Sequence, residues 1–488
     1  MTIVPSEVEF APCTFFSDGE WRDASGEPFD VVNPATETPL ASIAAPDAAQ
    51  VAETLAAAKR GQPAWGRLPA VVRGRQLRKI ADVLDAHREE LAQLLVAEVG
   101  KPLPQARGEV EWAAAYTRYM AEWDRRVEGE IVPSDEPNES IHLLRVPVGV
   151  VVAICAWNYP LAGFFRKLAP ALLTGNAVVA KPSPVTPLTS LRAMQLIVEA
   201  IELPAGVLNV LIGGTEVAEA LVGSPDASLV AMTGSTETGK RIMANAAAHM
   251  TRVSLELGGK APAIVWKDAD LASATAALLA ARHTNAGQVC TAAERVFVHV
   301  DVLKPFVAGY TDAVRALTVG DPRLEATDVG PLVTAEHREK VEAAVAEAVG
   351  GGATVAVGGS RPRGDGFARG YWLEPTVLTD VDPSMSVMTD EVFGPVTPIV
   401  GVADLDEALA LANDSQYGLS AYVFTNDYRT ALRVEQELDV GEIYINRTLG
   451  EAMQAHHSGH RESGMGGEDG KHGLLRYTQL KSVYHRYG

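Results

Sequence analysis

Three side chains in this sequence are suited to chemistry at a carbonyl group. Cys290 lies in NAGQVCTAAERV, where small neighbours leave room for a substrate beside a thiol that can act as a nucleophile. Glu256 ends the apolar segment SLELGG, and burial there would raise its pKa toward that of a general base. Asn158 follows a strongly apolar segment in CAWNYPL. The alternative interpretations are a small core cysteine, a carboxylate that caps backbone N–H groups, and a turn residue.

Two further charged residues and one glycine-rich segment are suited to binding an anion. Lys181 in VVAKPSP and Glu391 in TDEVFGP lie beside turn-forming residues. The segment TGSTETG, residues 233–239, follows an apolar stretch and begins a predicted helix, whose N-terminus would favour a pyrophosphate. The alternatives are solvated charges and a helix N-cap at Ser235 or Thr236. No G-x-G-x-x-G fingerprint follows any predicted strand.

The elements that must position these residues form an α/β pattern. Helical spacing predicts helices at 47–64 and 73–99, and a polar stretch broken by Pro and Asn predicts an exposed hairpin at 127–146. Strands and helices then alternate, which predicts a parallel doubly wound sheet. Its strands are expected at 148–155, 177–181, 206–213, 229–234 and 252–259, with helices at 161–173 and 188–202.

A second α/β series begins after residue 260. Strands are expected at 261–266, 294–300 and 353–359, and helices at 269–286, 303–317 and 335–349. Two α/β domains with a small extension are therefore predicted.

Composition excludes several classes of partner. Lys+Arg is 42 and Asp+Glu is 62, so the formal charge of −20 argues against nucleic acid and acidic membrane surfaces. The apolar stretch 146–157 is too short to span a bilayer. The first residues show no signal peptide, which predicts a cytoplasmic protein.

The cysteines and histidines do not predict a disulfide framework or a metal site. The three cysteines are far apart with no CxxC pair; Cys155 is expected in the core, and Cys13 to be inert. Four histidines lie near the C-terminus, but no carboxylate stands at a familiar ligand spacing from them (His456, His457, His460 and His472). We expect no metal.

Six motifs in a fixed order carry a family resemblance. CAWNYPL, VVAKPSP, MTGSTETG, LELGGK, GQVCTAAERV and EVFGP together resemble the aldehyde dehydrogenase superfamily, over nearly the whole chain from NPAT at 33–36 to the C-terminal LKSVYHRYG. The C-terminal part of the sequence is most similar to bacterial lactaldehyde/glycolaldehyde dehydrogenases.

The resemblance implies a mechanism. Cys290 would attack the aldehyde carbon, and the Asn158 amide with the Cys290 backbone N–H would hold the oxyanion. Hydride would pass to NAD or NADP, and Glu256 would activate water to hydrolyse the thioester. The cofactor would lie on a variant Rossmann domain, against Ile154, Trp157, Lys181, Ser183, Pro184, Gly213, Gly234, Ser235, Leu257, Glu391 and Phe393.

The resemblance also implies a domain division and an assembly. A cofactor-binding domain would comprise residues 1–126 and 147–257, and a catalytic domain residues 258–458. Residues 127–146 and 470–488 would form a β-arm that joins subunits into a homodimer or homotetramer.

Cofactor choice depends on one position. NAD-specific members of the family commonly carry a glutamate three residues after the Lys181 position, where this chain has Pro184. A carboxylate there would repel a 2′-phosphate, whereas Lys181 and the Ser183 hydroxyl can receive one. We therefore expect NADP, or use of both cofactors.

The expected substrate is a small hydroxylated aldehyde. In the most similar subfamily, the positions of Arg166, Glu451 and His457 line the substrate mouth, and this polar trio suits hydroxyl groups. Thr291 replaces an asparagine that is usual there, so the pocket is expected to differ and to accept lactaldehyde, glycolaldehyde, an aldose or an anhydro-sugar. Which of His456 and His457 faces the pocket stays open.

Three alternatives remain at this point. A CoA-acylating relative typically lacks the glutamate that is present here as Glu256. An aryl-aldehyde or semialdehyde enzyme would need different pocket residues. A family member without turnover would have lost its nucleophile, but Cys290 is present.

Overall fold

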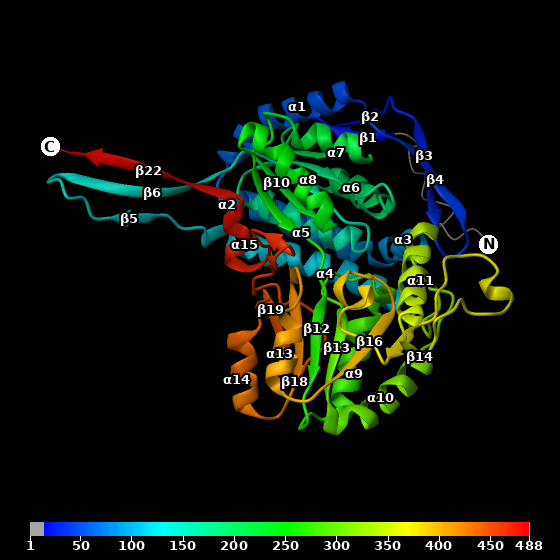
Figure 1. The fold of residues 1–488 in the computed structure, drawn as a ribbon. Helices are drawn as coiled ribbons and strands as arrows, with labels where there is room; N and C mark the ends of the chain where they lie inside the picture. Colours follow the sequence, from blue (N-terminus) through cyan, green and yellow to red (C-terminus); the bar gives the residue numbers. More distant parts are fainter. Residues whose placement is uncertain (1–13, 488) are drawn as a thin grey trace.

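The computed structural model describes residues 14–487 and contains two large sheets (Figure 1). Cys13 and the N-terminal segment judged for a signal peptide lie outside the described residues. No helix among residues 14–487 combines the length and apolarity needed to cross a membrane.

The first sheet has eight strands in the order β2-β1-β9-β8-β7-β10-β11-β21. Its five central strands are parallel, and β2, β1 and β21 add antiparallel edges. The predicted parallel sheet is therefore confirmed. The strands are β1 (Thr14–Ser17), β2 (Glu20–Asp23), β7 (Val150–Ile154), β8 (Ala177–Lys181), β9 (Leu208–Val210), β10 (Leu229–Thr233), β11 (Arg252–Glu256) and β21 (Gly464–Met465).

Helices cover both faces of this sheet, which explains its continuous apolar strands. Along β7, Val151 and Ala153 pack on one side, and Val150 and Val152 on the other. The first face is covered by α2 (Ala70–Ala86), α3 (Arg88–Val99), α4 (Leu103–Ala121), α5 (Pro160–Leu173) and α6 (Leu188–Ala200), the second by α1 (Ala48–Gly66), α7 (Thr215–Val222) and α8 (Thr236–Ala246).

The single helix predicted over 73–99 is wrong. The chain forms α2 and α3, separated at His87, whose backbone has φ −109° and ψ 21°. The apolar stripe nevertheless stays in phase, because Leu84 and Leu91 are seven residues apart, close to two helical turns. The spacing of the apolar residues therefore gave no indication that the helix is interrupted at His87.

The second sheet has seven strands in the order β14-β15-β16-β13-β12-β18-β19, all parallel except β14. The strands are β12 (Ala261–Val265), β13 (Ala293–His299), β14 (Thr354–Val357), β15 (Thr376–Thr379), β16 (Val396–Val402), β18 (Ser420–Phe424) and β19 (Glu442–Ile445). One face packs on α9 (Leu271–His283) and α10 (Val300–Arg315), the other on α11 (Ala335–Gly350), α12 (Ser386–Thr389), α13 (Leu405–Asn413) and α14 (Tyr428–Glu437).

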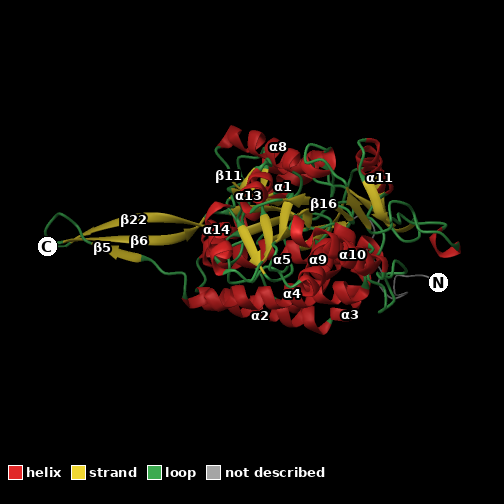
Figure 2. Ribbon diagram, turned by 60° about the horizontal axis from the view of Figure 1, so that its bottom comes forward, coloured by secondary structure: helices red, strands yellow, loops and turns green. Residues whose placement is uncertain are grey.

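A three-stranded arm projects from the body of the molecule (Figure 2). It pairs β6 (Glu139–Pro147) with β5 (Glu130–Val132) and with the C-terminal strand β22 (Thr478–Arg486), so the hairpin predicted at 127–146 is confirmed. Residues 470–476 do not enter the arm but form α15 (Gly470–Arg476), which packs on α5. The remaining strands are β3 (Pro28–Asn33), β4 (Thr38–Ala44), β17 (Tyr417–Gly418) and β20 (His460–Arg461).

A buried carboxylate fixes the start of α5, directly after Asn158. Glu109 on α4 accepts hydrogen bonds from the backbone N–H groups of Leu161 and Ala162, at 2.9 and 3.1 Å. It also pairs with the fully buried Lys101, whose ammonium lies 3.7 Å from the centre of the Tyr159 ring. Glu109 thus ties the Asn158 turn to the helical layer beneath it.

We predict that Glu109→Ala destabilises the fold by about 3–5 kcal/mol, because Lys101 would be left buried and unpaired. Glu111→Ala on the same helix is the matched control. Glu111 pairs with Arg88 at the surface, and its loss should cost less than about 1 kcal/mol. Urea unfolding followed by circular dichroism measures both, and equal effects would contradict the role given to Glu109.

Candidate active site

The loop that carries Cys290 begins with a left-handed turn. The helix predicted over 269–286 is wrong at its end: α9 stops at His283, and Asn285 and Ala286 have φ of 51° and 55°. This backbone does not continue a right-handed helix, and alanine gives no sequence signal for it. The turn leads the chain to Cys290, which is partly exposed.

Asn158 is bonded directly to this turn. Its side-chain Nδ2 donates to the carbonyl of Gln288 at 2.9 Å, and its own carbonyl accepts from Asn285 Nδ2 at 3.1 Å. The first sheet and the Cys290 loop are therefore cross-linked by two amide side chains. This contact holds the Asn158 amide beside Gln288, which is two positions before Cys290 in the chain. The second N–H of the amide makes no such bond among residues 14–487 and stays available.

Glu256 ends β11 in a buried position without a hydrogen-bonding partner. Neither of its carboxylate oxygens has one among residues 14–487, and the residue is only 3% exposed. Burial raises its pKa to about 8, although the nearby charge of His457 opposes that shift. A carboxyl group that titrates near neutral pH is typical of acid–base sites.

One large cavity, of about 1080 Å³, collects most of the residues expected to bind the cofactor. It also contains Cys290 and Asn158. Gly213 does not line it, although its carbonyl accepts a hydrogen bond from Lys181 Nζ at 2.8 Å. The other ten residues expected at the cofactor all do: Ile154, Trp157, Lys181, Ser183, Pro184, Gly234, Ser235, Leu257, Glu391 and Phe393.

The cavity offers the groups that a dinucleotide requires. The N-terminus of α8 opens into it at Ser235, whose hydroxyl also accepts the N–H of Thr238, so the N-cap at Ser235 is confirmed. Binding of a pyrophosphate at this helix N-terminus stays a prediction. Lys181 brings an ammonium whose pKa burial lowers to about 8. A phosphate-bearing ligand therefore fits the residues that are present.

The far wall of the cavity is held by a buried charge cluster. Glu294 accepts the backbone N–H groups of Val392 and Phe393 at 2.9 and 2.8 Å. Burial alone would raise its pKa, but Lys260 and Arg282 outweigh it and lower the pKa to about 2. Glu294 therefore stays ionised and anchors this loop.

The anchored loop presents an aromatic ring and a carboxylate to the cavity. Phe393 adopts a left-handed φ of 57°, and its ring meets Trp157 edge-to-face at 5.4 Å. Glu391 accepts the N–H of Gly259 at 2.8 Å, and burial raises its pKa to about 7. Both side chains thus reach the same cavity from the second sheet.

The residues expected at the substrate gather around Cys290 but do not line that cavity. The buried Thr291 hydroxyl donates to Glu451 at 3.4 Å. Arg166 forms ion pairs with Asp469 and Glu468, so its guanidinium is held between α5 and the segment before α15. Despite burial, the charges of His457 and Arg166 lower the pKa of Glu451. The group is polar; Thr291 and His457 are buried, and Arg166 and Glu451 are partly exposed.

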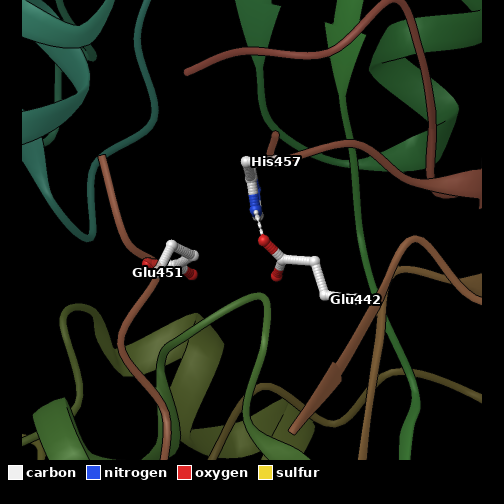
Figure 3. Close-up of side chains that lie close together, drawn as sticks. All are labelled: Glu442, Glu451 and His457. Atoms are coloured by element: carbon white, nitrogen blue, oxygen red, sulfur yellow. Dashed lines mark ion pairs between the residues drawn. The ribbon is translucent and has the colours of Figure 1, made fainter. Parts of the chain in front are cut away.

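His457, and not His456, faces the reaction centre. Its Nδ1 lies 3.2 Å from Glu442 Oε1 (Figure 3). Its Nε2 lies 3.7 Å from Glu256 Oε2. His456 points elsewhere, with its ring 5.7 Å from that of His472. His460 pairs with Asp439, so the four C-terminal histidines do not gather at one point.

Comparison with known proteins agrees with this geometry. The model of the aldehyde dehydrogenase family matches residues 21–483. The chain belongs to the aldehyde dehydrogenase family. It is 46% identical over 473 residues to lactaldehyde dehydrogenase of Escherichia coli, covering 96% of this chain and 98% of that one. It is 44% identical over 471 residues to 3,6-anhydro-alpha-L-galactose dehydrogenase of Vibrio sp., with the same coverage.

A solved structure extends the likeness to the fold. A 3,6-anhydro-L-galactose dehydrogenase in complex with NADP superposes with a TM-score of 0.95 at 45% identity, covering 96% of this chain and 99% of that chain. The protein is thus an NAD(P)-dependent aldehyde dehydrogenase with a Rossmann-like and a catalytic α/β unit. The missing G-x-G-x-x-G is consistent with this variant fold.

Three carboxylates of this aldehyde dehydrogenase site carried no functional prediction. Glu294 lies in the quoted motif GQVCTAAERV, so its position offered a signal that was not used. Glu442 and Glu468 lie outside the six motifs. They meet His457 and Arg166 only through tertiary contacts, and no sequence pattern could have shown those pairs.

Proposed function

We propose that this enzyme oxidises a small hydroxylated aldehyde to the carboxylic acid through a thioester on Cys290. The observation that carries the proposal is the place of Cys290. It lies in the same cavity as the residues suited to NAD(P) and close to His457, whose Nε2 is 3.7 Å from Glu256 Oε2. A nucleophile, a hydride acceptor site and a candidate base therefore share one centre.

The first half-reaction forms the thioester. The Cys290 thiolate adds to the aldehyde carbon, and the new oxyanion accepts hydrogen bonds from the free N–H of the Asn158 amide and the Cys290 backbone N–H. Bound NAD(P) supplies the chemistry of hydride acceptance. Phe393 and Trp157 are in edge-to-face contact and line this part of the cavity.

The second half-reaction releases the acid. Ionised Glu256 takes a proton from water, whose oxygen attacks the thioester and expels the Cys290 thiolate. The sum is aldehyde, water and NAD(P)⁺ giving carboxylic acid, NAD(P)H and one proton. The unpartnered oxygens of Glu256 leave it free to bind that water, which favours hydrolysis over transfer to CoA.

The polar groups around Cys290 support a hydroxylated substrate. Arg166, Thr291, Glu451 and His457 offer charged and hydroxyl groups in a buried or half-buried setting. These groups have protein partners, but they make the surroundings of Cys290 polar, and polar surroundings suit substrate hydroxyls better than an alkyl chain. The names of the two relatives above also describe hydroxylated aldehydes, lactaldehyde and an anhydro-sugar.

We also propose the implied domain division and a homodimer or homotetramer built through the arm. Exposed apolar side chains on its strands support this, because a free arm would leave them in water: Ile131, Leu144, Leu480 and Tyr484. A cytoplasmic location remains a prediction.

The first prediction separates the two half-reactions. Glu256→Gln should release one equivalent of NAD(P)H per active site rapidly and then stall, because the thioester forms but is not hydrolysed. Cys290→Ala should give neither burst nor turnover and still bind cofactor. Stopped-flow absorbance at 340 nm records both, and unchanged steady-state turnover of the Gln variant would remove Glu256 from the base role.

The second prediction concerns the cofactor. The kcat/KM for NADP should match or exceed that for NAD, and Pro184→Glu should lower the NADP value about tenfold, equivalent to about 1.4 kcal/mol. Pro184→Gln introduces a side chain of the same size as glutamate but without its charge. It should lower the kcat/KM for NADP by less than Pro184→Glu does. A wild-type preference for NAD above about tenfold would refute the expected use of NADP.

The third prediction concerns the substrate. Lactaldehyde, glycolaldehyde or a sugar aldehyde should exceed hexanal and benzaldehyde in kcat/KM by at least about tenfold, since the polar surroundings of Cys290 suit hydroxyl groups better than alkyl or aryl groups. Glu451→Leu should reduce the difference in kcat/KM between the hydroxylated aldehydes and hexanal or benzaldehyde. Efficient oxidation of hexanal or benzaldehyde alone would refute the assignment.

A further inference from the structure

Glu442 has no part in the mechanism above, yet it contacts one of its groups. It begins β19, at the edge of the second sheet, and its side chain is only 11% exposed. One carboxylate oxygen lies 3.2 Å from His457 Nδ1, and the other accepts the Tyr444 hydroxyl at 2.8 Å. In Figure 3 the carboxylate of Glu442 points directly at the imidazole. The contact is an ion pair that turns Nδ1 of the ring toward Glu442.

The opposite edge of that imidazole faces the reacting groups. His457 Nε2 lies 3.7 Å from Glu256 Oε2, and the nearby Cys290 side chain helps to raise the pKa of His457. Cys290 acts in the first half-reaction and Glu256 in the second. One imidazole therefore lies between a carboxylate of the second sheet and both reacting side chains.

We propose that Glu442 is a positioning residue that holds His457 as an imidazolium, with Nδ1–H toward Glu442 and Nε2–H toward Cys290 and Glu256. This inference rests on the proposed function and adds a group that acts in both half-reactions. No bond forms or breaks at Glu442, and the proton stays on His457 throughout. The catalytic contribution of His457 is its positive charge.

The charges around the ring agree with this assignment. Burial and the positive Arg166 disfavour the imidazolium, but contacts with Cys290 and Glu442 outweigh them, so the pKa of His457 lies well above its usual value. The titratable and charged groups that face it come from β11, the Cys290 loop, α5, β19 and the two C-terminal loops: Glu256, Cys290, Arg166, Glu442, Glu451 and Glu468.

The imidazolium would help each half-reaction in a different way. Its positive charge stabilises the thiolate of Cys290 before attack. Burial raises the pKa of Glu256 to about 8, and the His457 charge limits that rise, so more of the base is ionised at a given pH. Loss of the charge would move the onset of thioester hydrolysis to higher pH.

The proposed protonation of His457 separates this ion pair from a metal site. Ligand atoms of Glu442, Glu451 and His457 lie within 4.8 Å of one another. A protonated imidazole, however, has no lone pair for a cation. The three side chains therefore fit a charge-compensated acid–base cluster.

The test measures the pH dependence of Cys290 alkylation without aldehyde. Iodoacetamide modification is followed by mass spectrometry of the Cys290 peptide, because the chain has three cysteines. Glu442→Gln should slow alkylation at pH 7 about tenfold and shift the profile to higher pH by about one unit, as an ion pair of this kind implies. Tyr444→Phe removes a neighbouring hydrogen bond but keeps the carboxylate, and should change the rate less than about twofold.

A double-mutant cycle decides whether Glu442 acts through His457. His457→Asn should reproduce the shift, and Glu442→Gln should add nothing in that background. The acidic limb of kcat should move to higher pH in the same variants. A Glu442→Gln profile equal to that of the wild type, or an undiminished effect in the His457→Asn background, would overturn the proposal.

Two further measurements keep the test decisive. If Glu442→Gln does not fold, as judged by thermal unfolding, ¹⁵N chemical shifts of His457 in the wild type replace it: a protonated ring at pH 8 is expected, and a neutral ring overturns the proposal. Alkylation needs no substrate. Failure of the wild type to oxidise any hydroxylated aldehyde would therefore refute the proposed function, but it would not change the alkylation profile that tests the role of Glu442.

Discussion

The structure depends on compensating charges that are buried where the two large sheets meet. Chemistry at a carbonyl needs ionised groups, but each charge withdrawn from water carries a desolvation cost that a partner must offset. Glu109 is paired with Lys101, Glu294 with Lys260 and Arg282, and the Arg166–Lys167 segment with Glu468 and Asp469. These pairs also hold the loops in place.

Glu256 differs in having no hydrogen-bond partner in the described part of the chain, with His457 3.7 Å away, and its position explains its behaviour. It is as buried as the paired carboxylates, but its oxygens have no hydrogen-bond partner among residues 14–487. The paired Glu294 has its pKa lowered to about 2, whereas burial raises that of Glu256 to about 8. One protein therefore keeps one carboxylate permanently ionised to anchor a loop and another ready to change protonation during a reaction.

The two sheets contribute different parts of the centre. The first sheet supplies Asn158 and Glu256 near the ends of parallel strands, where ligands bind in open α/β sheets. The second supplies the Cys290 loop, the anchored Phe393 and Glu442. Because neither sheet holds a complete set, the hydrogen bonds between Asn158 and the Cys290 turn are as important to the geometry as the reacting groups.

The sequence alone determined the fold class, most elements, the family and a set of residues that the structure brings to one cavity. It could do so because buried parallel strands have continuous apolar runs and because motif residues lie next to strand ends, which are local properties. The break at His87 and the left-handed turn at Ala286 were invisible, since apolar spacing continues across the first and alanine normally favours a helix. Gly213 does not line the cavity and is linked to it only because its carbonyl accepts a hydrogen bond from Lys181.

Only the tertiary structure decided which of two adjacent histidines faces Cys290 and which carboxylate holds it. Adjacent residues in a loop have no fixed periodicity, so sequence could not separate His456 from His457. Glu442 and Glu256 are far apart in the chain and meet at one ring only when the second sheet docks against the first. The sequence specifies the residue types. The protonation state of a buried group, however, depends on which charges lie beside it, and only folding brings those charges together.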